Sequence, residues 1–201
     1  MSTEPVSPEV FESPEFWEEH KNKILIYGAV ILLALGGYGI YALTSQRKTA
    51  AAETAYAQAA TAAEFQAVTH DYAGTTAAGN AALQLADKLR SEKKYDEAAA
   101  AARDFIAKYP DHPLIGGAWV SLATTYELQG KLDEALSTYQ EAAVKYPEAY
   151  STPLAMNSQA RILTQQGKKE DAKRIYQDVV ARYPQSLFAH EAMRELRFLK
   201  R

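Results

Sequence analysis

The stretch IAKYPDHP at residues 106–113 has two close counterparts further along the chain, VKYPEAY at 144–150 and ARYPQSL at 181–187. The dipeptide Tyr-Pro therefore recurs at 109–110, 146–147 and 183–184, at a constant interval of 37 residues. Proline cannot continue an α-helix and disfavours helical geometry in the residue before it, so each Tyr-Pro predicts the end of a helix. A period of this length is typical of solenoids built from stacked helical hairpins. We therefore expect an all-α solenoid.

Small and acidic residues recur at the same interval. Gly130 and Gly167 allow the left-handed backbone that ends the first helix of a hairpin, and Lys93 occupies the corresponding position one unit earlier. Glu97 and Asp133 place negative charge in the first turn of the second helix, where it complements the helix dipole. Alanines occupy the positions where the two helices must approach closely: Ala86, Ala123 and Ala160 on first helices, and Ala98, Ala135 and Ala172 on second helices.

The central unit resembles the tetratricopeptide repeat (TPR) at every signature spacing. The matching residues are Trp119, Leu122, Ala123, Tyr126, Ala135, Tyr139, Ala142 and Pro147. The outer units depart from the signature at Gln159, where leucine is expected, and at Ala102, where an aromatic residue is expected. The resemblance implies about three helical hairpins over roughly 75–110, 111–147 and 148–184, followed by a capping helix within 185–201.

A separate segment precedes the repeats. Residues 24–43 read ILIYGAVILLALGGYGIYAL and contain no charged side chain. A helix of this length spans the bilayer core of about 30 Å. A buried globular helix would rarely lack charge for so long, and a cleaved signal peptide has a shorter apolar run of about 7–15 residues behind a basic segment. We therefore expect a transmembrane helix over Ile24–Leu43; its orientation stays open because two basic residues flank each end.

Two further segments flank the predicted span. Residues 1–23 form an acidic tail with six glutamates, in which Ser13-Pro14 is a suitable helix start. Residues 44–74 are rich in alanine at helical spacing and are expected to form a linking helix, continuous over 46–72, that packs on the first repeat. The repeat domain would then occupy 75–201.

Composition argues against several classes of function. The 201-residue chain has no cysteine, which excludes disulfides, thiol catalysis and cysteine-ligated zinc. Its four histidines are widely separated and are expected at surface or loop positions, so no metal site is predicted. A net charge of −3 argues against nucleic-acid binding. Because no phosphate loop or catalytic motif occurs, we expect neither a cofactor nor an enzyme.

A solenoid of this class usually binds a peptide or partner segment along its first helices. By resemblance to TPR groove positions, the candidate residues are Asn80, Leu83, Asp87, Arg90, Val120, Thr124, Glu127, Asn157, Arg161 and Thr164. At the chain end, Leu196, Phe198 and Leu199 lack a following helix, so they would either fold back as a cap or form a homodimer contact.

The complete layout resembles the ancillary, membrane-anchored TPR subunit of the bacterial Sec translocon. The resemblance rests on an acidic N-terminus, the stretch FWEEHKNK at residues 16–23, one span and a series of TPR hairpins. It implies an inner-membrane protein with a cytoplasmic N-terminus and a periplasmic domain that contacts translocon subunits, periplasmic chaperones and secretory chains. The alternatives are a cell-envelope assembly scaffold, for outer-membrane biogenesis, division or surface appendages, and an enzyme, which would need a polar pocket.

Overall fold

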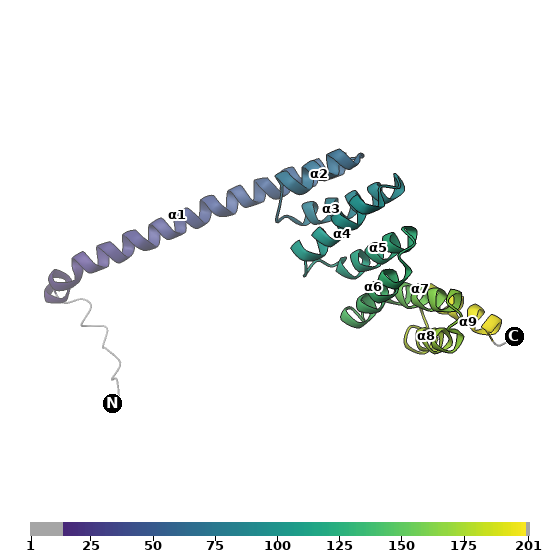
Figure 1. The fold of residues 1–201 in the computed structure, drawn as a ribbon. Helices are drawn as coiled ribbons and strands as arrows, with labels where there is room; N and C mark the ends of the chain where they lie inside the picture. Colours follow the sequence, from purple (N-terminus) through teal and green to yellow (C-terminus); the bar gives the residue numbers. More distant parts are fainter. Residues whose placement is uncertain (1–13, 200–201) are drawn as a thin grey trace, which may run out of the picture. The chain divides into compact units, whose positions relative to one another are not determined.

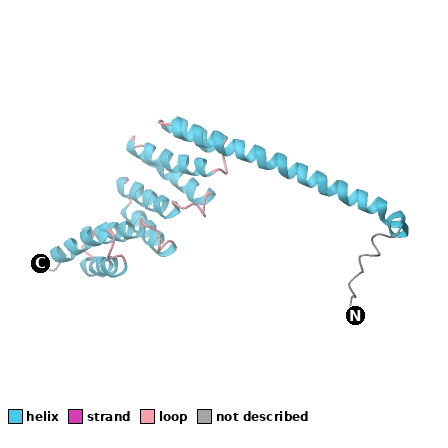
Figure 2. Ribbon diagram, turned by 180° about the vertical axis from the view of Figure 1, so that it is seen from behind, coloured by secondary structure: helices cyan, strands magenta, loops and turns pink. Residues whose placement is uncertain are grey.

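The computed structural model describes residues 14–199, which are entirely helices and connecting turns (Figures 1 and 2). The predicted all-α solenoid is confirmed. The helices are α1 (Pro14–Gln58), α2 (Ala62–Asp71), α3 (Thr76–Ser91), α4 (Tyr95–Lys108), α5 (Ile115–Leu128), α6 (Leu132–Lys145), α7 (Thr152–Gln165), α8 (Lys169–Arg182) and α9 (Leu187–Leu199). The chain divides after Lys48 into two compact units.

The first unit contains most of helix α1. Its apolar side chains are exposed on all sides, including Tyr27, Leu33 and Tyr41. Within the described residues, His20–Gln58 is long and apolar enough to cross a membrane by length and composition, with a mean hydropathy of 2.0 in its most apolar window. The expected acidic tail lies mostly outside the described residues, although α1 begins at Pro14 as its sequence suggested.

The prediction of one continuous helix over 46–72 is wrong. Helix α1 ends at Gln58, and α2 begins after Thr61 in a complete capping box. The Glu64 carboxylate accepts hydrogen bonds from the backbone N–H groups of Ala60 (2.8 Å) and Thr61 (2.9 Å). These bonds lower the pKa of Glu64. The cap satisfies N–H groups that a new helix would otherwise leave unpaired, so a chain reversal replaces the expected helical turn.

In the second unit, helices α3 to α8 form three hairpins of a first and a second helix, as Figure 1 shows. Each helix from α2 onward packs against the next one along the chain. The first helices α3, α5, α7 and α9 also contact one another in that order and therefore form one layer. This nearest-neighbour packing is the arrangement expected of a solenoid.

The core of each hairpin combines close alanines with a large side chain from the second helix. Phe105, Tyr139 and Val179 are almost completely buried on α4, α6 and α8. At the C-terminal end, Leu196 and Leu199 pack against the cluster around Tyr176 and Val179, as expected of a cap. Phe198 is exposed instead.

The same turn closes all three first helices. In each, one residue adopts positive φ: Gly130 at 76°, Gly167 at 78° and Lys93 at 61°. The next N–H then donates to a carbonyl five residues back, from Lys131 to Tyr126 and from Lys168 to Leu163, each at 2.9 Å. This is the Schellman motif, in which glycine avoids the steric cost that Cβ imposes in the left-handed region. Lys93 therefore carries a cost that its two counterparts do not.

The loop between α4 and α5 contains a buried histidine. His112 is a loop residue as predicted, but its ring is covered and meets Phe105 edge-on at 5.1 Å. A Cβ added to Gly79 would lie 2.9 Å from the ring, so this glycine leaves room for the imidazole. The Nδ1 atom accepts a hydrogen bond from the Leu114 N–H (3.2 Å), which requires the neutral ring. Burial lowers the pKa of His112.

We expect Lys93→Gly to stabilise the full-length chain by about 0.5–1 kcal/mol, because glycine removes the strain of the left-handed turn. The reciprocal change Gly130→Lys should destabilise it by about the same amount. Urea denaturation followed by circular dichroism measures both. Equal stability of Lys93→Gly and the parent chain would contradict the explanation.

We also expect acid to destabilise the domain through His112. Its folded-state pKa is lowered, so between about pH 6.5 and that lower pKa the unfolded chain binds a proton that the folded chain does not. The contribution of the neutral His112 ring to the free energy of unfolding is fully present above about pH 6.5 and is lost as the pH falls from there through the lowered folded-state pKa. His112→Gln should reduce the loss of stability between about pH 7 and pH 5, whereas His190→Gln, at an exposed position, should leave it unchanged. Urea denaturation across this range tests both variants.

Candidate interaction surface

The ten candidate groove residues lie on three first helices: Asn80 to Arg90 on α3, Val120 to Glu127 on α5, and Asn157 to Thr164 on α7. Because these helices are neighbours in one layer, their polar side chains lie within reach of one another. In the structure, several of these side chains form hydrogen-bonded groups that join neighbouring helices. Others are buried or bonded to their own backbone.

Asp87 and Arg90 form the first group, on α3. Arg90 Nη2 donates to Asp87 Oδ1 at 2.8 Å. Ser121 on α5 completes the group, since its hydroxyl donates to the same Asp87 oxygen at 3.1 Å and accepts from Arg90 Nη1 at 3.1 Å. These contacts link the first and second hairpins. Ser121 was not among the predicted residues.

Glu127 and Arg161 form the second group, between α5 and α7. The guanidinium donates in parallel to both carboxylate oxygens, at 2.7 and 2.8 Å. This two-bond geometry is the strongest that an arginine–carboxylate pair adopts. It raises the pKa of Arg161, with hydrogen bonding to Glu127 as the largest cause. The pair therefore links the second and third hairpins.

Two tyrosine hydroxyls lie near this pair. The hydroxyl of Tyr139 lies 2.9 Å from that of Thr124, and burial raises its pKa. Burial also raises the pKa of Tyr176 to about 12. Neither phenol is therefore suited to give up its proton near neutral pH, and both act as hydrogen-bonding groups in the packing of α6 and α8.

The remaining α5 and α7 candidates are less accessible. Val120 and Asn157 are buried, and the Asn157 amide donates to the Phe188 carbonyl on α9 at 2.9 Å. The hydroxyls of Thr124 and Thr164 donate to the carbonyls of residues 120 and 160 on their own helices. Many of the polar side chains that the sequence predicted to line a groove thus form hydrogen bonds within the solenoid.

An open hollow of about 190 Å³ lies where α3 meets α5. Three of the predicted residues line it, Asn80, Leu83 and Asp87. The other lining residues are Tyr56, Gln84, Leu114, Gly117, Ser121 and Tyr150. Sequence reasoning missed these six, although Tyr150 and Leu114 carry a detectable signal: each is a large apolar residue shortly after a Tyr-Pro turn. Tyr150 is 81% exposed, more than any other tyrosine, phenylalanine or tryptophan whose side chain the structure describes.

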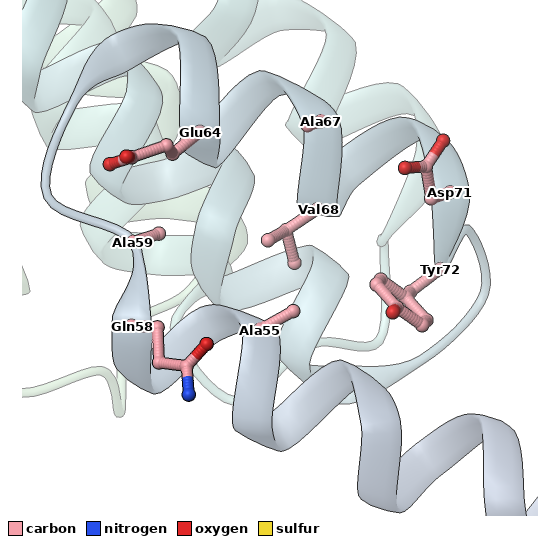
Figure 3. A pocket seen from close by; sticks show the side chains of 8 residues that line it. All are labelled: Ala55, Gln58, Ala59, Glu64, Ala67, Val68, Asp71 and Tyr72. Atoms are coloured by element: carbon pink, nitrogen blue, oxygen red, sulfur yellow. The ribbon is translucent and has the colours of Figure 1, made fainter.

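A second hollow of about 300 Å³ lies between the end of α1 and α2. Figure 3 shows Ala55, Val68 and Tyr72 around it, with Glu64 and Asp71 at its edges. Both acids are engaged, Glu64 in the helix cap and Asp71 with His70. No metal-ligand cluster occurs among residues 14–199. The hollow between α3 and α5 is therefore the better candidate for binding, since it joins predicted groove residues to exposed apolar ones.

We expect a double-mutant cycle on Glu127→Gln and Arg161→Gln to give a coupling of about 1 kcal/mol, because the two-bond pair is partly shielded from water. The exposed pair of Glu141 and Lys145 on α6 is the control and should couple by about 0.3–0.5 kcal/mol. Urea denaturation of the single and double variants provides the values. Equal coupling energies in the two pairs would show that the Glu127–Arg161 pair stabilises the domain no more than an ordinary surface ion pair does.

Comparisons with known proteins agree with this architecture. No curated protein matches the sequence. The solved structure of TPR-like repeats from a putative kinesin light chain of Podosopora anserina superposes with a TM-score of 0.56 at 16% identity, covering 69% of this chain and 74% of that one. BtubC from P. vanneervenii gives a TM-score of 0.56 at 21% identity, covering 77% of this chain and 65%, just under two thirds, of that one. At these identities the likeness concerns the fold alone. The family model of the tetratricopeptide repeat-like domain matches residues 14–196, and the chain therefore belongs to that family.

Proposed function

We propose that this protein is a membrane-anchored interaction module, an accessory to the bacterial Sec translocon and the periplasmic chaperone network. The observation that carries the proposal is the union, in one chain, of a TPR-like repeat domain with a helix apolar enough to span a bilayer. Repeat domains of this family typically bind proteins and are typically not enzymes. The binding surface is the first-helix layer, with the hollow between α3 and α5 as its most accessible part.

Membrane insertion supplies the cover that the apolar helix lacks. Side chains such as Leu33 and Ile40 are exposed on α1, and an uncharged run of this length is costly in water. A bilayer removes that cost, and the helix satisfies its own backbone groups there. We propose the inner membrane, with the N-terminus cytoplasmic and the repeat domain periplasmic. The sidedness follows the translocon-like layout, because the flanking charges do not decide it.

The translocon role rests on the resemblance of the N-terminal layout together with the kind of surface present. An accessory that meets emerging chains needs a shallow, open site that accepts many sequences. An open hollow with an exposed aromatic rim fits that need better than an enclosed cavity does. The alternative is a cell-envelope assembly scaffold, which would form lasting complexes with structural proteins instead of brief contacts with secreted ones.

We expect the full-length protein, purified from gently cross-linked bacterial membranes, to bring down translocon subunits and secretory precursors. A photo-reactive amino acid replacing Tyr150 should capture them, whereas one replacing Gln140 on α6 should not. Capture of envelope structural proteins instead would overturn the translocon role and favour the scaffold.

Topology has its own test, which the absence of cysteine makes simple. A single cysteine replacing Gln140 should react with a membrane-impermeant maleimide once the outer membrane is permeabilised. A single cysteine replacing Thr3 should react only after the inner membrane is also opened. The reverse pattern would contradict the proposed orientation.

A further inference from the structure

Gly117, in the wall of the hollow, has no packing role that explains it. Glycine inside a helix is less favourable than alanine by about 0.5–1 kcal/mol. The preceding residue, Gly116, is required, since a Cβ there would lie 2.7 Å from the Cβ of Ala149. A Cβ on Gly117 would meet no atom within 4 Å. The missing side chain therefore leaves open space in the wall of the hollow.

The apolar lining indicates what that space accepts. Leu83, Leu114 and Tyr150 border the hollow, and the last two are exposed. At about 190 Å³ the hollow is smaller than typical small-molecule sites of about 300–1,000 Å³. A volume of this size suits one large side chain of a partner better than a cofactor. Burying an aliphatic or aromatic side chain against these three residues would supply the affinity.

The polar lining adds a preference for peptide backbone and for positive charge. Asn80 and Gln84 lie one turn apart on α3, and neither side-chain amide forms a hydrogen bond within residues 14–199, so both amides can pair with an extended backbone. Asp87 is the only Asp, Glu, Lys or Arg among the lining residues. Its bonds to Arg90 and Ser121 both fall on Oδ1. The second carboxylate oxygen is left to accept from a lysine or arginine.

We propose that this hollow binds extended polypeptide segments in which a large apolar residue lies beside a lysine or arginine. The apolar side chain occupies the space over Gly117 and packs against Tyr150. The neighbouring base pairs with Asp87, while the amides of α3 hold the backbone. The inference rests on the proposed function and names the class of segment that the interaction module selects.

Fluorescence anisotropy of the full-length protein in detergent micelles tests the selectivity. The probe is a labelled nine-residue Gly/Ser peptide with a central Leu-Phe pair flanked by two lysines. Matched peptides carry glutamates in place of the lysines, or alanines in place of Leu-Phe. We expect the first peptide to bind at least about tenfold more tightly than either match. Equal binding of the three peptides, or no binding of the first, would overturn the proposal.

Two variants tie the binding to the hollow. Gly117→Leu fills the open space while improving helix propensity, so it should weaken binding at least about tenfold without lowering the melting temperature. Gln140→Leu places the same side chain at an exposed position of α6, away from the hollow, and this variant should bind the peptide like the parent chain. Asp87→Asn keeps the shape of the carboxylate and should bring the lysine and glutamate peptides to nearly equal affinity. Unchanged binding by Gly117→Leu would place the peptide elsewhere and reject this site.

The peptide-binding test and the membrane cross-linking test can fail independently of each other. If cross-linked membranes yield translocon subunits but the lysine peptide does not bind, the hollow is rejected and the accessory role stands. If the peptide binds with the expected selectivity while only envelope structural proteins are captured, the hollow stands and the accessory role is rejected.

Discussion

Close approach of the two helices in each hairpin is the constraint on which the rest of the domain depends. Ala98, Ala135 and Ala172 on the second helices are fully buried, and Ala123 and Ala160 oppose them on first helices. A larger residue at any of these points would separate the helices, because a close-packed interior has no room for it. Only with the helices this close do the large side chains fill the space between neighbouring hairpins. The Schellman turns then fix where each second helix begins.

Much of this architecture could be predicted from the chain. Each signature residue acts locally and for one physical reason. Proline after a tyrosine ends a helix, glycine at 130 or 167 allows the left-handed turn, and alanine at a fixed offset allows close approach, so the pattern predicts the hairpins directly. The split near Thr61 could not be seen with the same ease. Alanine-rich sequence favours helix throughout 46–72, and only the pairing of Thr61 with Glu64 offers the chain a better local alternative.

The candidate site was less predictable, because it depends on side chains from different hairpins. The sequence of a single helix predicts which positions face a groove. It does not show that Arg161 is already paired with Glu127, or that Asn157 is buried against α9. The same holds for Gln129, which donates to Asp96 at 2.8 Å across the hairpin boundary. Gln166 and Asp133 repeat this contact one unit later. Such pairs lie 31 to 34 residues apart in sequence, and the repeat pattern alone does not specify which side chains of neighbouring hairpins meet.

The distribution of these paired groups favours one part of the first-helix layer for binding. Between α5 and α9 most polar side chains of the first-helix layer already bond to one another or to backbone carbonyls, so a partner there would have to break existing bonds to make new ones. Between α3 and α5 the repeat pattern is interrupted, since Gly117 has no side chain and Tyr150 stands uncovered. A partner can gain contacts at that point without displacing any. The repeated contacts thus build a scaffold that is largely bonded to itself, and the departure at Gly117 leaves the opening at which we propose that a partner binds.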